Sequence, residues 1–301
     1  MQVLDQATIR SRVSLAGARE AVRAAFCALS DDNVVAPDEL AMTLAHGGEL
    51  HVKGAHLGGG HLAFKAATGA FPAGGNSGFT AVLDAHTGAP VAILDDGGWL
   101  TEIRTAAASA VSAQALARAD SKRLAILGGG IQAAYQVAAL REAFDLDQVT
   151  VWSRSPETAA RFAAENAASA AESPEDAVAD ADIVICCTPS REPLLTHSML
   201  APGTHVIAMG SDMKGKRELA EDVVLGCDRF VADQISITSR VGELAHVPSA
   251  RDRTVELGDV LTGRASGRTD ATQLTVSDHC GLGIQDAAMA QLVMEAEPLS
   301  P

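Results

Sequence analysis

The sequence predicts an α/β protein in which a doubly wound parallel sheet is joined to a second, α+β part. From residue 124 to about residue 275, short apolar runs alternate with stretches of helical spacing, which is typical of βα units and a parallel sheet. Before residue 100, several strand-like runs follow one another without that alternation. The length of 301 residues also suits two domains.

The first part is expected to contain a helix, a polar loop and several strands. Residues 14–29 have helical apolar spacing, whereas residues 46–60 are rich in glycine and histidine. Their histidines recur every five residues, which matches no usual zinc motif, so we expect a glycine-rich loop and no metal site. Residues 61–71 and 79–100 are expected as strands, with a hairpin turn where Gly88 takes positive φ. An alanine-rich helix over 101–119 follows.

The glycine-rich turn after the apolar run 124–127 predicts a dinucleotide site. Gly128 and Gly130 fall where a strand turns into a helix, so the backbone can approach a pyrophosphate whose charge meets the helix N-terminus. Ala133, at the third position of the fingerprint, still allows close packing of helix and strand. The simpler interpretation is a tight turn, but a second strand ends roughly 20 residues later, as a Rossmann-type unit requires.

The end of that second strand indicates which dinucleotide is held. Ser153, Arg154 and Ser155 stand where an NAD enzyme usually has an acidic residue for the ribose hydroxyls. An arginine there can hold the 2′-phosphate of NADP, so NADP(H) is favoured and NAD(H) remains possible. The alternative is a solvated loop arginine.

The composition favours a small molecule as partner. Apolar residues make up 47% of the chain, yet no apolar run approaches the roughly 18 residues that span a membrane. Acidic residues outnumber basic ones by 38 to 23 with no basic block, so we expect neither nucleic acid nor an anionic membrane. The five cysteines lack CxxC spacing and the N-terminus has no secretory pattern, which favours reduced thiols in a cytoplasmic protein. One apolar strand, over 181–188, contains two of them.

Five segments carry a resemblance that extends from Phe64 onward: LTEIRTAAASAVSAQALAR, LAILGGGIQA, VWSRSPETAARFA, PGTHVIAMGSDMKGKREL and GLGIQD. In this order they resemble the ornithine cyclodeaminase/mu-crystallin family. The resemblance implies a homodimer in which residues 1–118 with 278–301 form a substrate-binding and dimerisation domain, the last helix rejoining the first part. It also implies that residues 119–277 form a Rossmann dinucleotide-binding domain.

The activity that the resemblance implies is hydride transfer between a nicotinamide and the Cα of a small amino or imino acid. An NAD(P)-dependent imine reductase or amino-acid dehydrogenase is the leading hypothesis. One alternative is an ornithine cyclodeaminase-type lyase, which releases ammonia and recycles NAD. The other is a non-catalytic protein that holds NADP and a ligand.

Three residues are expected to carry the chemistry: Lys65, Arg104 and Asp212. Lys65 lies in an apolar run, where an ammonium is costly unless it is paired or its pKa is lowered; a solvent-facing edge lysine is the alternative. Arg104, at the expected helix start, can hold an α-carboxylate in a bidentate pair, unless it pairs with Glu102 or Asp95. Asp212 follows an apolar strand on the carboxyl side of the sheet and suits proton transfer, unless it caps the next helix.

Further contacts follow from the resemblance. The segment 36–44 lacks the arginine of cyclodeaminases, and His51 and Lys53 stand where relatives have a glutamate and an apolar residue. We therefore expect His51 and Lys53 to bind substrate, and a second anionic group on that substrate fits better than the ammonium of ornithine. The full set of expected cofactor contacts is Thr105, Gly128, Gly130, Ile131, Gln132, Ser153, Arg154, Ser155, Thr188, Met209, Gly210, Lys216 and His279.

Overall fold

The computed structural model describes residues 1–72 and 77–296, which divide into two compact units. Unit 1 comprises residues 1–108 together with the C-terminal segment from 282, and unit 2 comprises residues 109–281. The division falls within helix α3 (Trp99–Leu116) and just before helix α10 (Gly283–Glu295). Residues 297–301, the end of the expected domain 1–118 with 278–301, lie outside the described residues. The substrate and dinucleotide roles of the two expected domains stay predictions.

Unit 1 is built on a six-stranded sheet in the order β1-β6-β5-β4-β3-β2. Neighbouring strands are antiparallel, except that β1 and β6 run parallel. The strands are β1 (Gln2–Asp5), β2 (Leu40–Thr43), β3 (Glu49–His56), β4 (His61–Gly69), β5 (Ser77–Asp84) and β6 (Pro90–Asp95).

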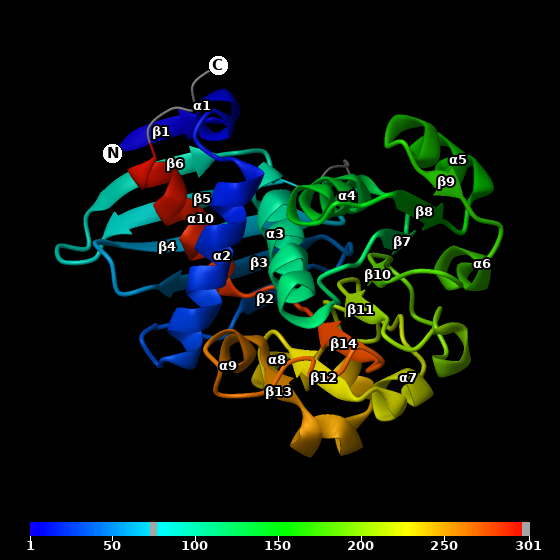
Figure 1. Cartoon of the computed structure of the whole chain (residues 1–301). Helices are drawn as coiled ribbons and strands as arrows, with labels where there is room; N and C mark the ends of the chain where they lie inside the picture. The colour runs from blue at the N-terminus through cyan, green and yellow to red at the C-terminus, as the bar shows by residue number, and fades with distance from the viewer. Residues whose placement is uncertain (73–76, 297–301) are drawn as a thin grey trace. The chain divides into compact units, whose positions relative to one another are not determined.

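Helices α1 (Gln6–Arg10), α2 (Leu15–Ser30) and α10, with the first part of α3, complete unit 1. The Ser14 hydroxyl accepts a hydrogen bond from the Gly17 amide at 3.0 Å and so caps α2. Helix α10 packs against α2 and against β3 and β4, so the C-terminal helix joins the first part of the chain, as expected (Figure 1). This packing brings α10 side chains onto one face of the sheet.

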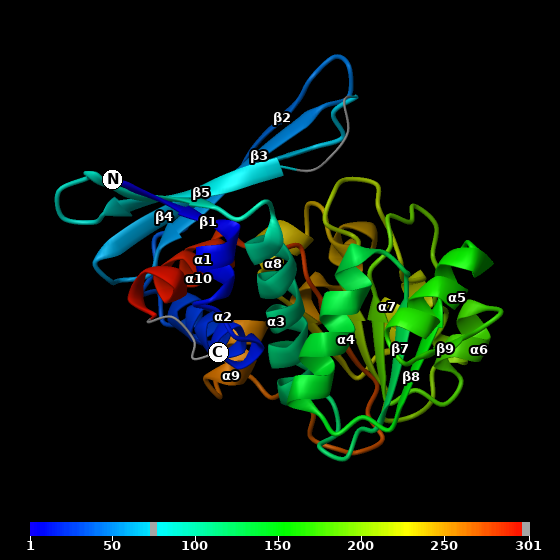
Figure 2. The same cartoon turned by 90° about the horizontal axis from the view of Figure 1, so that it is seen from above.

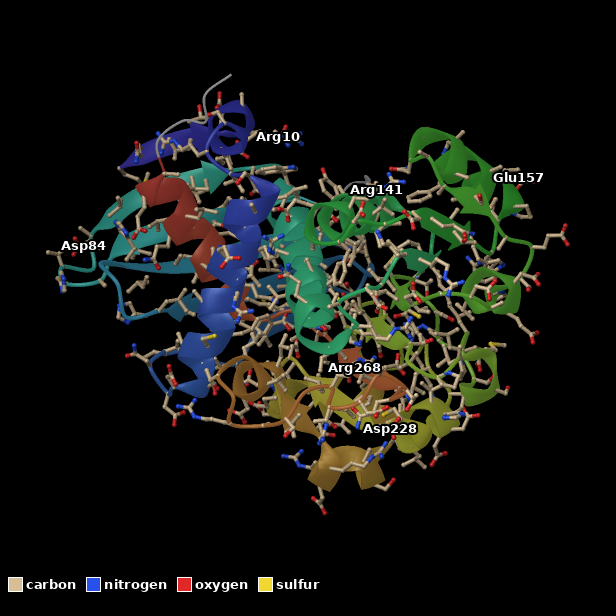
Figure 3. The ribbon with its side chains drawn as sticks, in the orientation of Figure 1. Arg10, Asp84, Arg141, Glu157, Asp228 and Arg268 are labelled. Carbon is tan, nitrogen blue, oxygen red and sulfur yellow. The ribbon has the colours of Figure 1, made fainter. Side chains whose placement is uncertain are left out.

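The hairpin between β5 and β6 forms as expected. Gly88 has φ of 70°, in the region that glycine adopts without strain. One carboxylate oxygen of Asp84 accepts hydrogen bonds from the amides of His86 and Thr87, at 2.9 and 2.7 Å. Asp84 lies at the end of this hairpin away from α10 (Figure 3).

The expectation of a loop over residues 46–60 was wrong, because Glu49–His56 forms β3 between β2 and β4. Cross-strand pairing outweighs the turn-forming composition here. Gly54 does not mark a turn: a Cβ atom there would lie 2.6 Å from the carbonyl oxygen of Ala63 on β4. By contrast, a Cβ atom on Gly283 would lie 2.5 Å from the carbonyl oxygen of Gly54, so the absence of a side chain on Gly283 lets α10 begin directly against the strand.

Unit 2 contains an eight-stranded parallel sheet in the order β13-β12-β14-β11-β10-β7-β8-β9 (Figure 1). Figure 2 shows β7, β8 and β9 next to one another at one side of this unit. From β7 the chain moves outward to β8 and β9, then returns to place β10 on the other side of β7. This reversal makes the sheet doubly wound, as the sequence predicts. The strands are β7 (Arg123–Leu127), β8 (Gln148–Trp152), β9 (Ser169–Ala170), β10 (Ile183–Cys186), β11 (His205–Ala208), β12 (Arg229–Ala232), β13 (Val255–Glu256) and β14 (Thr275–Asp278).

The centre of the parallel sheet is the core of unit 2. Every residue of β10, β11 and β14 is buried, as expected for parallel strands covered on both faces. The connecting helices are α4 (Ile131–Ala143), α5 (Pro156–Glu165), α6 (Pro174–Val178), α7 (Glu221–Gly226), α8 (Ile235–Thr238) and α9 (Leu257–Leu261), with 3₁₀ turns at His197–Met199, Glu243–His246 and Pro248–Arg253. Among residues 1–72 and 77–296, no helix combines the length and apolar character needed to cross a bilayer.

Candidate active site

The turn between β7 and α4 has the form that a phosphate-binding site needs. Gly128 has φ of 120°, and a Cβ atom there would lie 2.7 Å from the carbonyl oxygen of Cys187. Gly130 is the N-cap of α4, and no side chain hydrogen-bonds the helix start from that position. A Cβ atom on Gly130 would meet no atom within 4 Å. The amides at the start of α4 therefore face open space, where an anion can approach them.

A cavity of about 310 Å³ lies in unit 2 at the carboxyl ends of β7, β8 and β10. Because the strand order reverses between β7 and β10, this is the switch point at which doubly wound sheets bind ligands. The cavity suits part of a dinucleotide, with the glycine turn against its phosphates. It is lined by Gly128, Gly129, Gly130, Trp152, Ser153, Arg154, Ser155, Thr158, Cys187, Thr188, Pro189, Ser190 and Leu194.

The segment after β8 contributes one capping residue and one exposed cation to this cavity. The Ser155 hydroxyl accepts from the Thr158 amide at 3.2 Å and donates to Glu157, which lies on α5 at the surface (Figure 3). Arg154 is exposed and makes no hydrogen bond or ion pair within the described part of the chain. Its guanidinium is thus available to an anion in the cavity.

Glu218 fixes the position of the cavity-lining residue Thr188, and the sequence did not predict this role. One of its carboxylate oxygens accepts from both the amide and the hydroxyl of Thr188, each at 2.7 Å, and the other accepts from the Gly210 amide at 2.8 Å. A Cβ atom on Gly210 would lie 2.6 Å from that carboxylate. Burial raises the pKa of Glu218 to about 7. Its only sequence signal was its place in the family-like segment GSDMKGKREL.

Asp212 and Lys216 come together in the loop after β11. The Lys216 ammonium donates to the Asp212 carboxylate at 2.6 Å, and Asp212 is exposed. The N-cap of the next helix, α7, is Ala220, so the capping alternative for Asp212 was wrong. Both residues belong to unit 2, whereas Lys65 and Arg104 belong to unit 1.

The other expected cofactor residues differ in environment. Ile131, the first residue of α4, has 75% of its surface exposed, which is unusual for a large apolar side chain and fits a ligand-facing position. Gln132 accepts a hydrogen bond from Gln136 one turn later. His279 is buried, its ring nitrogens have no hydrogen-bond partner in the described ranges, and burial lowers its pKa to about 3. Met209 lies directly after β11, while Thr105 lies on the part of α3 that belongs to unit 1.

Unit 1 brings Lys65 and Arg104 together around a carboxylate that the sequence reading missed, Asp286 on α10. The Lys65 ammonium donates to Asp286 Oδ1 at 2.9 Å, and Arg104 Nε lies 3.3 Å from the same oxygen. Lys65 also donates to the Thr101 hydroxyl, and Arg104 Nη1 donates to the Gln285 side-chain oxygen at 3.2 Å. The signal for Asp286 and Gln285 was the final dipeptide of GLGIQD.

The electrostatics of this group follow from its burial. Burial lowers the pKa of Lys65, and the neighbouring Arg104 charge lowers it further, whereas Asp286 raises it. Burial alone would raise the pKa of Asp286, but the charges of Lys65 and Arg104 bring it below the usual value. Asp286 is therefore ionised, and two buried cations, Lys65 and Arg104, share its one carboxylate.

The structure corrects two interpretations of these cations. Lys65 is not an edge lysine: β4 lies inside the sheet between β3 and β5, and Lys65 is 8% exposed. Arg104 does not begin a helix, because α3 starts five residues earlier, at Trp99. There the Asp96 carboxylate accepts from the Leu100 amide at 2.6 Å and caps the first turn. The ion pair of Arg104 is with Asp286, from a distant part of the chain.

His51 and Lys53 lie beside this group, but each already has a carboxylate neighbour. Lys53 is the direct cross-strand partner of Lys65, so both point to the same face of the sheet. Glu39 lies 2.7 Å from His51 and 3.6 Å from Lys53, and its hydrogen bond raises the pKa of His51. A second anionic group on a substrate would have to compete with Glu39, so that expectation stays a prediction.

The fold and these two sets of residues define a Rossmann-type α/β protein, with a dinucleotide-type cavity in unit 2 and a buried cation pair in unit 1. The chain belongs to the ornithine cyclodeaminase/mu-crystallin family, whose model matches residues 1–298. A cyclodeaminase of Sinorhizobium fredii, uncharacterised in activity, is 36% identical, with 98% of this chain and 95% of the relative covered.

Two solved structures share the fold over nearly the whole length. An archaeal alanine dehydrogenase dimer with bound NAD has a TM-score of 0.90 at 28% identity, covering 97% of this chain and 94% of that one. The Δ¹-pyrroline-2-carboxylate reductase of Thermococcus litoralis, in complex with NADH and L-proline, has a TM-score of 0.90 at 26% identity, covering 98% and 97%. Family membership thus agrees with the resemblance seen in the sequence.

Proposed function

We propose that this protein is an NAD(P)-dependent oxidoreductase that interconverts a small α-imino acid and the corresponding amino acid. Two solved relatives are named as an alanine dehydrogenase and a pyrroline-2-carboxylate reductase, which both act at the Cα of such a compound. The dinucleotide would be held in unit 2 by the glycine turn, the α4 N-terminus and the segment after β8. When bound, its nicotinamide supplies or accepts the hydride.

The observation that carries this proposal is the charge imbalance at Lys65, Arg104 and Asp286. Two cations on one carboxylate leave one positive charge in excess within the trio, and a buried excess charge is costly unless an anion completes it. An α-carboxylate has the charge and the two oxygens to do so, and a guanidinium holds it with defined orientation. Arg104 would therefore fix the carboxylate and with it the position of Cα.

Lys65 would move the proton that accompanies the redox step. Its lowered pKa makes the ammonium a better acid than an exposed lysine, so it can protonate the substrate nitrogen in the direction of reduction. Asp212, exposed and paired with Lys216 in unit 2, is the second candidate for proton transfer. A protein that only binds a ligand would have no need of such groups, which disfavours the non-catalytic alternative.

For the cofactor we propose a preference for NADP(H). The support is Arg154, which lines the cavity without a protein partner among the described residues, at the strand end where NAD enzymes usually have a carboxylate. Both solved relatives hold NAD or NADH, so the preference is a difference between this chain and them.

We further propose that the protein is a homodimer that pairs through the sheet of unit 1. The sheet face opposite α10 exposes large apolar side chains on three strands of one half of the sheet: Leu40 and Met42 on β2, Phe64 on β4 and Phe79 on β5. β3 contributes Val52, which is opposite Leu40. Large apolar side chains that gather on one exposed sheet face are typical of an interaction site. The alanine dehydrogenase relative is a dimer.

The test of the activity is a direct assay of the purified full chain. NADPH or NADH is mixed with pyrroline-2-carboxylate, piperideine-2-carboxylate, or 2-oxo acids with ammonia or methylamine, and absorbance of the reduced cofactor is followed. We expect oxidation of the cofactor with at least one imino acid and none with the 2-oxo acid alone. Release of ammonia from ornithine or lysine with a catalytic amount of NAD, without net oxidation of reduced cofactor by any imine, would replace the proposal with the lyase.

A further inference from the structure

We propose that Asp286 is a positioning residue of the proposed active site: it holds the Lys65 ammonium and the Arg104 guanidinium on one carboxylate oxygen and keeps Lys65 charged. The inference rests on the proposed function, because it concerns the two cations that would receive the substrate. It adds a residue that acts through Lys65 and Arg104.

The geometry carries the inference. Asp286 Oδ1 is 2.9 Å from Lys65 Nζ and 3.3 Å from Arg104 Nε, whereas Oδ2 has no hydrogen-bond partner in the described part of the chain. A carboxylate that served stability alone would be expected to use both oxygens, because a buried acceptor without a hydrogen bond is destabilising. Here one oxygen fixes the separation of two cations from different elements, β4 and α3.

The start of α10 makes this position rigid. Asp286 lies in the first turn of a 13-residue helix, where the N-terminal dipole stabilises a carboxylate. The neighbouring Gln285 side-chain oxygen accepts from the Leu282 amide at 3.0 Å and from Arg104 at 3.2 Å. Consecutive residues of one helical turn thus contact the same guanidinium: Gln285 accepts a hydrogen bond from Nη1, and Asp286 forms an ion pair at Nε, which has no hydrogen bond within the described residues.

The charges around Lys65 show what Asp286 does to it. Arg104 and Lys53 favour loss of the ammonium proton, as does burial, whereas Asp286 opposes all three. Asp96 is the other carboxylate nearby; burial raises its pKa, and its carboxylate caps α3 rather than contacting Lys65. Thr101 contributes only a neutral hydroxyl. Asp286 is therefore the group whose charge sets the protonation of Lys65.

The substitution Asp286→Asn tests this role, because it keeps the size of the side chain and removes the charge. The pKa of Lys65 is read in the full-length protein from the pH dependence of its labelling by an amine-reactive reagent, followed by mass spectrometry. We expect the pKa of Lys65 to fall in D286N and to stay near the wild-type value in Asp286→Glu. Glu295→Gln, which removes an exposed carboxylate from the last turn of the same helix, is the matched control and should change nothing.

A second measurement connects the residue to the reaction. If the Lys65 ammonium is needed, kcat/KM for imine reduction declines on the alkaline side, and in D286N this decline moves to lower pH with at least a tenfold loss of kcat/KM. Binding of reduced cofactor, by its fluorescence, is expected to stay within twofold of wild type.

The outcomes separate the two proposals. An unchanged pKa of Lys65 in folded D286N would overturn the positioning role. So would a loss of kcat/KM in D286N whose alkaline decline occurs at the same pH as in wild type. A lowered pKa of Lys65 in D286N with no imine reduction by wild type would support the positioning role and refute the proposed function.

Discussion

Arg154 is the residue on which the proposed cofactor preference depends. It is exposed beside the cavity of unit 2 and has no protein partner within residues 1–72 and 77–296, so its charge is available to a 2′-phosphate. In Arg154→Asp we expect NADPH to bind at least tenfold more weakly, since a charge-assisted contact worth about 1.5–3 kcal/mol is lost and replaced by repulsion. NADH should bind equally well or better, because a carboxylate at this strand end can hold the ribose hydroxyls.

Titration of cofactor fluorescence with both nucleotides measures this change. Arg161→Asp, an exposed arginine on the adjoining helix α5, is the matched control for the general effect of charge. Wild-type protein that binds NADH more tightly than NADPH would contradict the NADP(H) preference directly.

Single residues differ in how far their place could be predicted from the sequence. Lys65 stood out because a charge in an apolar run requires a special environment, and it is buried and paired. Arg104 stood out as a cation at an expected helix start; the helix begins earlier, but Arg104 too is buried and paired. Asp286 carried no such local signal, because a carboxylate in the first turn of a helix is common. Its partner Lys65 is 221 residues earlier in the chain, and such a pairing depends on the packing of α10 on β4.

The β7–α4 turn allows binding and folding to be tested separately. Gly130 has φ of −84°, which any residue adopts, and a Cβ atom there would meet no protein atom within 4 Å. In Gly130→Ala we therefore expect unfolding free energy equal to wild type or higher by about 0.4–1 kcal/mol, because the unfolded chain loses freedom. Reduced cofactor should bind at least tenfold more weakly, since the methyl group occupies space next to the helix start that phosphate oxygens need.

Urea unfolding and fluorescence titration give the two quantities. Gly60→Ala, in the turn after β3, is the control: it also meets open space, and neither stability loss nor weaker cofactor binding is expected there. Unimpaired cofactor affinity in G130A would remove the α4 N-terminus from the proposed phosphate site.

The elements of unit 2 were predictable because local patterns agree with the fold there. Buried parallel strands appear as short apolar runs, and the glycine turn marks the first crossover. In unit 1 the prediction of a loop for segment 49–56 was wrong. Its glycine and histidine content indicates a loop, whereas pairing with its neighbours β2 and β4 makes it a strand. Gly54 leaves room for the neighbouring strand β4 at Ala63 and Phe64 rather than forming a turn, which only the tertiary structure reveals.

At the scale of the whole molecule, the two faces of the unit 1 sheet differ in a way that predicts assembly. One face is covered by α10, while the other exposes Phe64 and Phe79, at 36% and 40%. Apolar residues on adjacent strands make a continuous surface, and two copies related by a twofold axis would bury the same patch on each other. We expect wild-type protein to have twice the chain mass of 30.9 kDa in solution.

Phe79→Asp places a charge within this surface and should shift the protein to the monomer, because burying an unpaired carboxylate costs several kcal/mol. Sedimentation at several concentrations measures the mass. Leu225→Asp is the matched control: this apolar residue on α7 of unit 2 is exposed to a similar extent, at 43%, and its replacement should leave the dimer intact. A folded F79D that remains dimeric while L225D dissociates would place the interface on unit 2 and leave the apolar sheet face without its proposed partner.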